Sequence, residues 1–535
     1  MSTAIDNKRY ETAMQPRQLE VNLPAWCALK WYHALTCSLF VVMFLYFCYV
    51  PVASPTTWSA VAAGQIAASE TDGIAGYVPL SRGIRSLELG WVGRWLSASV
   101  YRVGGSELLS ISFAVVQTSV WIVWSIVFYR LTRRWLAAWG AGAVAICCYQ
   151  QLAGFDGESL GQLAMALLAL LLSTNYDRAT GDFRWSRAAM WKWCAVLVLF
   201  VVWSNCHASF VVGGAWLVCL AIARLAASRW QCGSIKIADD EDLRSRIWLC
   251  ELAWLTTLCQ PHGLLLWKSV LWWPDHPLLT TLGGWSPPIM AGWTGVCVGV
   301  AWLLWVVAAR HRGHLPGVWV VTPIAATIAV ACCGNNMIWA APLMTASVIA
   351  LWGIHKPSED DDIGDGAHHN EASTAVIVPT KKRGLQFAFT LVTGLVLWLG
   401  FCFSPLGSVL GGSHRSERQV VGNSMPCGAK QYCIENQPAG LVFCPNYWSD
   451  FLRVDNPVQV MANTDMYRLP EIVIADYGRI YRGQQGWTTL VEKYAISDLI
   501  IDKAKQPSLT RQVRRGISSW KVVFEDAQTL IVQRS

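Results

Sequence analysis

The sequence predicts an all-α polytopic transmembrane bundle followed by a small extracytoplasmic α/β domain. Of the 535 residues, 54% are hydrophobic and only 14% are charged, whereas soluble domains are about a quarter charged. The chain also holds 31 tryptophans, a residue that is favoured at membrane interfaces. Long apolar runs recur between residues 31 and 406, and most approach the roughly 20 residues that a spanning helix needs.

These runs predict about eleven transmembrane helices. They cover residues 31–52, 108–128, 135–152, 159–173, 190–202, 210–227, 247–259, 294–309, 318–333, 337–352 and 385–406. A polar segment, 1–30, precedes the first run, and the long loop 53–107 follows it with amphipathic helices of its own. Residues 355–384 include Glu359-Asp360-Asp361-Asp362 and few apolar residues, which predicts a disordered cytoplasmic linker.

The positions of lysine and arginine predict the orientation in the membrane. The N-terminal segment and every second hinge (130–134, 175–192, 228–246, 310–313 and 355–384) hold nearly all the basic residues of the short loops. The hinges between them (153–158, 204–209, 260–292 and 334–336) hold almost none. The positive-inside rule therefore predicts a cytoplasmic N-terminus in the inner (plasma) membrane and an extracytoplasmic C-terminal region. The net charge of +7 is spread over the loops, so we expect no nucleic-acid partner.

The tail, residues 413–535, changes character and predicts the α/β domain. Its candidate elements are buried strands at 440–443 and 498–502, an amphipathic helix at 487–494, and a hairpin formed by 520–524 and 529–533. Strands that alternate with helices favour an α/β layer.

Three cysteines of the tail, Cys427, Cys433 and Cys444, fall on the predicted outer side, where disulfides form. Our first expectation is a Cys427–Cys433 pair, although spacing alone leaves the pairing open.

Polar side chains gather in the hinges of the predicted outer face. They are Asp156, Glu158, Asn205, His207, Gln260, His262, Asp275, His276, Asn335 and Asn336. Carboxylates and imidazoles at one membrane face suit acid–base chemistry, and with an arginine such as Arg94 they suit phosphate binding. The alternative is that polar helix ends simply meet water, but polar groups at a membrane boundary are costly and usually partnered. Spacing supplies no third ligand beside Asp275-His276, so we expect no cofactor, although a divalent metal stays possible.

Several motifs occur in a recognisable order. The first loop carries Thr56-Thr57-Trp58-Ser59-Ala60, then Trp91-Val92-Gly93-Arg94-Trp95-Leu96 and Tyr101-Arg102-Val103-Gly104-Gly105. Later hinges carry Trp203, Asn205, His207 and Phe210, then Gln260-Pro261-His262-Gly263 and Gly284-Trp285-Ser286-Pro287-Pro288. This order resembles bacterial polytopic proteins related to the GT-C glycosyltransferases, the class that includes the protein mannosyltransferases. Those enzymes transfer a sugar from a polyprenyl phosphate outside the membrane.

The resemblance implies a lipid-linked sugar donor and membrane lipid as partners, and it implies roles for particular residues. Asn205 and His207 would position phosphate or acceptor, Arg94 would offset phosphate charge, and His262 and Trp285 would belong to the same substrate site. The family's first-loop aspartate, its expected catalytic carboxylate, falls on Thr56. A threonine is not a general base near neutral pH. Asp156 and Glu158 are therefore the candidate catalytic residues.

Two functions remain open at this stage. The first is a GT-C-like glycosyltransferase that uses a polyprenyl-phosphate donor at the outer face. The second is an inactive scaffold of the cell envelope that binds a partner through residues 413–535. The sugar, the acceptor and the oligomeric state are not encoded in any motif.

Overall fold

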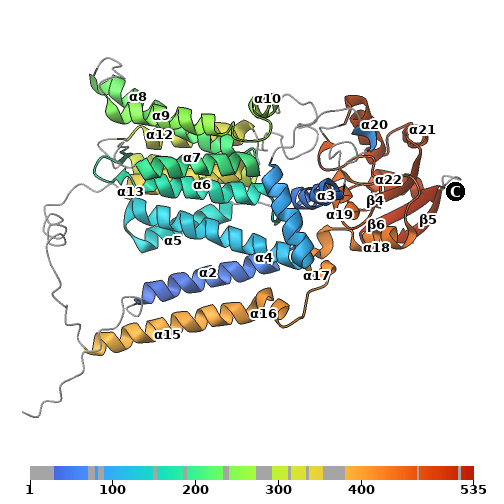
Figure 1. Ribbon diagram of the computed structural model, residues 1–535, viewed down its shortest axis with the longest axis horizontal. Helices are drawn as coiled ribbons and strands as arrows, with labels where there is room; N and C mark the ends of the chain where they lie inside the picture. Colours follow the sequence, from blue (N-terminus) through green and yellow to red (C-terminus); the bar gives the residue numbers. More distant parts are fainter. Residues whose placement is uncertain are drawn as a thin grey trace, which may run out of the picture.

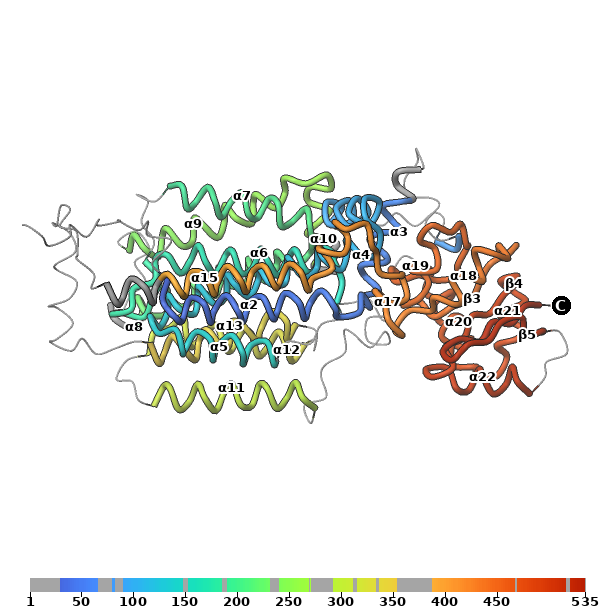
Figure 2. Tube along the Cα trace, turned by 90° about the horizontal axis from the view of Figure 1, so that it is seen from below, coloured from blue at the N-terminus to red at the C-terminus, as the bar shows by residue number. Residues whose placement is uncertain are grey.

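The computed structural model describes residues 29–69, 79–81, 90–148, 153–184, 190–232, 240–272, 292–310, 315–332, 336–353, 380–466, 469–515 and 520–534. A bundle of nearly parallel helices carries the C-terminal domain at one of its ends (Figures 1 and 2). Trp285 and most of the predicted linker 355–384 lie outside the described residues, as do residues 1–28.

The bundle contains most of the predicted apolar runs as helices. They are α2 (Trp31–Tyr49), α4 (Trp91–Thr132), α5 (Trp135–Cys148), α6 (Gly157–Ser173), α7 (Met190–Cys206), α8 (Phe210–Cys232), α9 (Glu241–Thr256), α11 (Trp293–Arg310), α12 (Val318–Cys332), α13 (Met337–Gly353) and α15 (Thr380–Phe403). Between α9 and α11 lies the short α10 (Leu264–Trp272). By length and composition, α2, α4, α8 and α11 can cross a membrane, and six further apolar helices are shorter. The chain is a multi-pass helical membrane protein, whereas the number of about eleven crossings stays a prediction.

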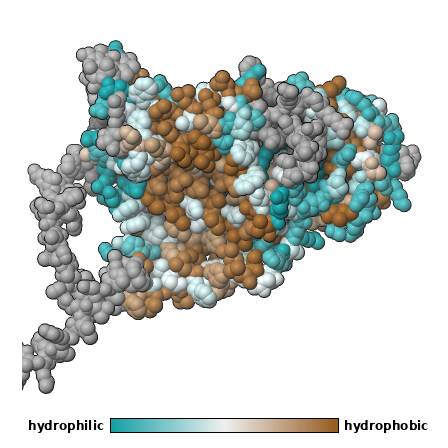
Figure 3. Space-filling view, in the orientation of Figure 1, coloured by the Kyte–Doolittle hydropathy of each residue, from teal (hydrophilic) through white to brown (hydrophobic). Residues whose placement is uncertain are grey.

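The surface of the bundle suits a lipid environment. Hydrophobic residues cover its middle in the view of Figure 3, whereas hydrophilic residues gather toward its ends and over the C-terminal domain. Val42, Leu303 and Leu391 each expose more than half of their surface. Helix α13 lies inside the bundle against α4, α5, α11 and α12, and nearly all of its side chains are buried.

The first predicted outer loop forms α3 (Pro55–Ser69) and the first turns of α4. Helix α4 then kinks at Gly104 and Gly105, where Gly105 has a φ of 61°. This is a backbone conformation that glycine adopts without a steric cost. The kink lets one continuous helix serve as part of the loop and then as a spanning segment. Helices α3 and α4 pack against each other.

The C-terminal domain confirms the predicted α/β layer. Its sheet has the order β3-β4-β6-β5, built from β3 (Leu441–Phe443), β4 (Ile496–Asp502), β5 (Trp520–Glu525) and β6 (Thr529–Arg534). Strands β3 and β4 are parallel, and β6 pairs antiparallel with both β4 and β5, which confirms the predicted hairpin. Helix α16 (Pro405–Leu410) follows α15 and packs against it and α4. The helices of the domain are α17 (Glu417–Val421), α18 (Cys427–Asn436), α19 (Asn446–Arg453), α20 (Glu471–Arg482), α21 (Trp487–Lys493) and α22 (Pro507–Arg514).

Cys427 and Cys433 are the first and seventh residues of α18, and both thiols are free. Six residues of α-helix rise about 9 Å, whereas a disulfide joins Cα atoms no more than about 7 Å apart. The Cys427–Cys433 pair expected from the sequence is therefore wrong.

The domain is docked on α3 and α4. The ring of Trp58 meets that of Phe451 edge-on at 4.9 Å between centroids. Tyr101 donates a 2.6 Å hydrogen bond to Asp455, and Gln65 donates one of 2.8 Å to the same carboxylate. The first loop therefore forms the docking surface between the membrane bundle and the C-terminal domain.

Candidate functional site

The start of α4, the start of α6 and the end of α7 meet next to this docking surface, around the backbone carbonyl of Cys206. A Cβ added to Gly93 at the start of α4 would lie 2.7 Å from the Cys206 oxygen, and one added to Gly157 at the start of α6 would lie 2.5 Å from it. Glycine permits this close approach because it has no side chain. The starts of α4 and α6 and the end of α7 consequently converge, and they bring the hinges at 153–158 and 204–209 together.

Asp156 is the buried centre of this convergence, with 2% of its surface exposed. It is the N-cap of α6, where Oδ1 accepts from the Ser159 amide at 3.1 Å, and the Asp156 amide donates to the Ser159 hydroxyl at 3.2 Å. The other oxygen, Oδ2, accepts from the hydroxyls of Ser54 at 3.2 Å, Thr56 at 2.5 Å and Thr57 at 3.2 Å. An ionised carboxylate only accepts hydrogen bonds, and it has about four lone-pair sites over its two oxygens, which is the number of donors gathered here.

The contact with Thr56 bears on the missing aspartate. The resemblance to GT-C enzymes places the family carboxylate at position 56, where this chain has threonine. The structure places the carboxylate of Asp156 within hydrogen-bonding distance of that threonine hydroxyl. A carboxyl group is therefore present beside position 56, although it comes from the N-cap of α6 instead of from the first loop.

His207 follows α7 and is half-buried. Its Nδ1 accepts a 3.2 Å hydrogen bond from the Ser209 amide, which leaves the proton of a neutral imidazole on Nε2. Burial lowers the pKa of His207, and the negative charge of Asp156 acts in the opposite direction. The imidazole is therefore a neutral Nε2 donor at pH 7. Its Cδ2 lies 3.4 Å from the Cβ position of Gly157, so Asp156 and His207 flank the same helix start.

Asn205 is used to join chain segments. Its Oδ1 accepts from the Trp91 indole at 2.8 Å, and its Nδ2 donates to the carbonyls of Val201 at 2.8 Å and Cys259 at 3.0 Å. Both amide hydrogens are thereby occupied. Asn205 holds the start of α4 and the end of α9 against α7, and its predicted contact with phosphate stays a prediction.

The remaining predicted site residues have separate surroundings. Arg94 forms a 3.1 Å ion pair with Asp465 of the C-terminal domain. Glu158 lies in the first turn of α6 and is half-buried. His262 is half-buried in the turn after α9, near the Cys259 carbonyl that Asn205 binds. Trp285 and the Asp275-His276 pair lie outside the described residues. Among the residues that the structure describes, no three His, Cys, Asp or Glu side chains gather as metal ligands.

Sequence reasoning missed the hydroxyl groups around Asp156. Ser54, Thr56, Thr57 and Ser159 all contact its carboxylate or its backbone. One signal was present, because Asp156-x-x-Ser159 has the spacing of a helix N-cap. The contribution of Ser54 and Thr57 had no local signal, since they lie about a hundred residues away in the sequence.

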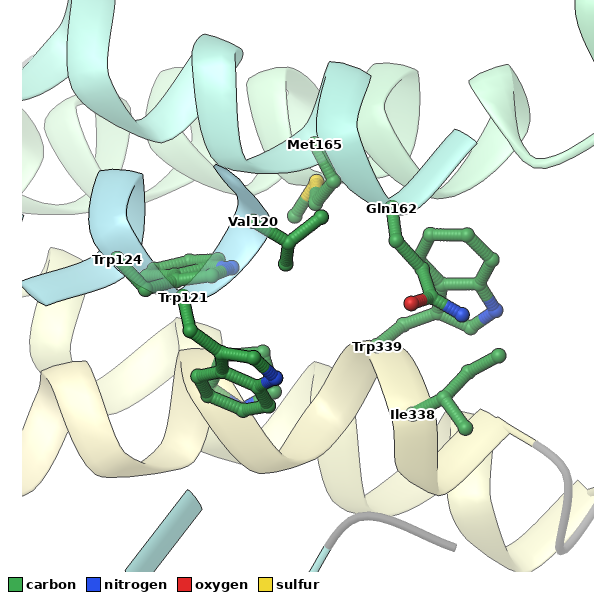
Figure 4. Close-up of a pocket in the computed structure, with 8 residues that line it drawn as sticks. Val120, Trp121, Trp124, Gln162, Met165, Ile338 and Trp339 are labelled. Atoms are coloured by element: carbon green, nitrogen blue, oxygen red, sulfur yellow. The ribbon is translucent and has the colours of Figure 1, made fainter. Parts of the chain in front are cut away.

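A second candidate location lies deeper between α4, α6 and α13. Figure 4 shows Trp121, Trp124, Gln162 and Trp339 around a cavity of about 10 Å³. This volume holds about one water molecule, so the cavity is too small for a sugar. The Gln162 side-chain oxygen instead accepts a 2.8 Å hydrogen bond from the Gln117 amide nitrogen of α4, so each of these two groups has a partner inside the bundle.

Comparison with known proteins supports the fold but gives no sequence family. No protein-family model and no curated protein matches the chain. The solved structures that match include an archaeal oligosaccharyltransferase and the bacterial protein ArnT, and the chain has a GT-C-like fold. The oligosaccharyltransferase AglB of Archaeoglobus fulgidus, in complex with an inhibitory peptide and a dolichol-phosphate, matches with a TM-score of 0.50 and 10% identity over 88% of this chain and 70% of that chain. ArnT of Cupriavidus metallidurans, bound to undecaprenyl phosphate, matches with a TM-score of 0.47 and 12% identity over 94% and 97%.

Proposed function

We propose that this protein is a GT-C-like integral membrane glycosyltransferase that transfers a sugar from a polyprenyl-phosphate donor at the outer face of the inner membrane. The observation that carries the proposal is the contact between Asp156 and Thr56. It puts a carboxylate beside the position where the resemblance expects one. The GT-C-like fold supports the proposal, and the AglB structure that shares this fold holds a dolichol-phosphate.

In the proposed reaction an acceptor group gives its proton to Asp156 while its oxygen or nitrogen bonds to the anomeric carbon of the sugar. The bond from that carbon to the phosphate oxygen breaks, and the polyprenyl phosphate leaves with the electron pair. The Nε2 proton of His207 serves as a donor to the phosphate, because Nδ1 is occupied by Ser209. Glu158, in the first turn of α6, is the second candidate for the base.

Three further residues complete the proposed site. Arg94 offsets phosphate charge if the donor displaces Asp465 from its guanidinium. His262 and Trp285 contact the donor from the hinge 260–292. Asn205 is a positioning residue, because its hydrogen bonds fix the hinge that carries His207.

One observation favours the alternative of an inactive scaffold that binds a partner through residues 413–535. Asp156 is only 2% exposed, and its two oxygens already accept bonds from four donors. A carboxylate held in this way can simply cap α6. Catalysis requires that an acceptor reach it, and therefore that some of these hydroxyl contacts open.

The first experiment is mass spectrometry of lipid that co-purifies with the gently extracted protein. Wild type is expected to retain a polyprenyl phosphate, bare or glycosylated, and His207→Ala is expected to lose it. Only bulk phospholipid in both samples would favour the scaffold.

A transfer assay then tests the carboxylates with Asp156→Asn and Glu158→Gln. Asparagine is as good an N-cap as aspartate, so Asp156→Asn removes the charge and keeps the cap of α6. Asp240→Asn is the matched control, because Asp240 caps α9 through the Leu243 amide. We expect the control to retain activity. Transfer that survives the combined Asp156→Asn and Glu158→Gln changes would refute the assignment of the base.

A further inference from the structure

Helices α8 and α9 form an apolar groove at the edge of the bundle. The two helices lie side by side (Figure 1), and the space between them has a volume of about 250 Å³. Of the lining residues that the structure describes, Glu251 of α9 is charged and the others are apolar, among them Val218 and Ile222 of α8. The groove has the volume of about eight water molecules, but its apolar lining is unfavourable for water. It therefore suits apolar side chains or lipid chains.

Glu251 lies deep along the length of the bundle. At the end of the bundle away from the C-terminal domain, Asp242 of α9 forms a 3.4 Å ion pair with Arg224 of α8. From Asp242 to Glu251 an α-helix rises about 13 Å, which is close to half of the roughly 30 Å hydrocarbon layer. Glu251 also lines the groove together with Val218, which lies well inside the candidate membrane span Phe210–Trp230.

The carboxylate of Glu251 faces out of the protein. Glu251 is exposed together with Trp248 and Leu255, and this spacing puts the three residues on one face of α9. Within the part of the chain that the structure describes, Glu251 has no hydrogen bond and no ion pair. Acidic side chains in membrane-spanning segments are rare, and they almost always face the bundle interior or water and pair with another group. A carboxylate in this position therefore indicates that another molecule supplies its partner.

The depth and the charge of Glu251 select the kind of partner. A phospholipid is a poor one, because its cationic group stays in the headgroup layer outside the hydrocarbon. A second copy of this chain, docked through the same surface in a two-fold dimer, would bring a second Glu251 to the first, and like charges disfavour each other. A helix that carries lysine or arginine fits both features. Its apolar side chains pack into the groove between two helices, and its cation compensates the carboxylate.

We propose that the groove between α8 and α9 binds a transmembrane helix of a partner protein, and that a lysine or arginine in the middle of this helix pairs with Glu251. The proposal does not rest on the transfer chemistry, because no residue that lines the groove belongs to the proposed transfer site. A central basic residue is costly for a helix that is surrounded by lipid alone. The two charges therefore stabilise each other in the complex.

The first test is the binding of synthetic helices to the full-length protein in phosphatidylcholine liposomes. Two leucine-rich peptides differ only in their central residue, lysine or leucine, and each has a photoreactive residue beside it. We expect the lysine peptide to crosslink to α8 and α9 at a peptide-to-lipid ratio about five- to thirtyfold lower than the leucine peptide. Glu251→Gln should remove this difference. Glu435→Gln is the matched control and should keep it, because it removes an exposed carboxylate from α18 of the C-terminal domain.

The second test identifies the natural occupant in native membranes. A photoreactive amino acid replaces Ile222, which lines the groove and is 48% exposed, and mass spectrometry identifies what it crosslinks. We expect a segment of another protein that is long enough to span the membrane and has a central lysine or arginine. The crosslink should be lost when Glu251→Gln is added.

Equal binding of the two synthetic peptides would overturn the ion pair, as would a preference for the lysine peptide that survives Glu251→Gln. In native membranes, three results would overturn the proposed partner. They are crosslinks to phospholipid only, crosslinks to this chain itself within one copy or between two, and crosslinks to a helix without a central basic residue.

Discussion

Replacing Arg415 with leucine tests how the C-terminal domain is held on the bundle. The Arg415 Nε lies 2.9 and 3.0 Å from the two carboxylate oxygens of Glu107, which follows the kink in α4. The same guanidinium donates to the Cys48 carbonyl at 3.0 Å and to the Ser110 hydroxyl at 3.2 Å. The side chains of Arg415 and Glu107 are 18% and 5% exposed. One arginine thus connects α2, α4 and the segment that enters the C-terminal domain.

The expected cost follows from the burial of Glu107. Arg415→Leu leaves this carboxylate in a nearly closed environment without its cation, and breaking a buried pair in this way costs about 3–5 kcal/mol. A loss of this size lowers the folding equilibrium constant by more than about a hundredfold, since about 1.4 kcal/mol is a factor of ten. Adding Glu107→Gln removes the unpaired charge, so the double variant should recover a large part of the loss.

The measurement is equilibrium unfolding of the purified protein in mixed micelles, followed by tryptophan fluorescence. Arg418→Leu is the control, because Arg418 is exposed in α17 and its loss should cost less than about 0.5 kcal/mol. The reasoning is refuted if Arg415→Leu costs no more than Arg418→Leu. It also fails if Glu107→Gln brings no recovery in the Arg415→Leu background.

Two smaller perturbations address the convergence around Cys206. Gly93→Ala puts a methyl group 2.7 Å from the Cys206 oxygen and 2.9 Å from the Gly157 Cα. The same titration should therefore show that the free energy of unfolding falls by about 1–3 kcal/mol. Gly140→Ala is the control, because a Cβ at Gly140 meets open space, and it should be neutral or slightly stabilising. Burial lowers the pKa of His207 from 6.5 in the folded protein, so the unfolded state binds a proton on this imidazole more readily. The free energy of unfolding should therefore fall as the pH drops below 6.5, and it should level off below the pKa that His207 has in the folded protein. Replacing His207 with glutamine should remove this part of the pH dependence, and an unchanged slope would contradict the assignment.

The fold class was predictable because the hydropathy of a segment indicates whether it is buried in the membrane or in the protein interior. The apolar runs match helices such as α6 and α12 to within a few residues, and the β5–β6 hairpin was evident from alternation around a short turn. The sequence predicts that this span ends at residue 202, before the polar hinge 204–209, whereas α7 continues to Cys206. Tertiary contacts with Trp91 and Cys259 satisfy that asparagine inside the helix.

The candidate site was predictable only in part. The hinges of Asp156 and His207 were expected at one end of the bundle, and they meet at Gly157. The pair of Arg94 with Asp465 had no signal, because 371 positions separate the two residues. The local sequence pattern predicts where helices end and which residues are buried. It does not predict contacts between residues so far apart, because these depend on how the C-terminal domain docks on the bundle.

The proposed replacement of the first-loop carboxylate by Asp156 can be tested by returning an aspartate to position 56. The Thr56 hydroxyl lies 2.5 Å from Asp156 Oδ2, so Thr56→Asp puts two carboxylates in one buried site. Two such groups cannot both ionise easily, and the repulsion amounts to about 1–3 pKa units for the pair, or roughly 1.4–4 kcal/mol at pH 7. We expect this destabilisation in the micelle titration, and we expect it to shrink as pH falls and the pair takes up a proton. Combining Thr56→Asp with Asp156→Asn should restore stability, because one charge and the cap of α6 are kept. If the double variant is no more stable than Thr56→Asp alone, the two positions do not share one charge site, and Asp156 acts only as a helix cap.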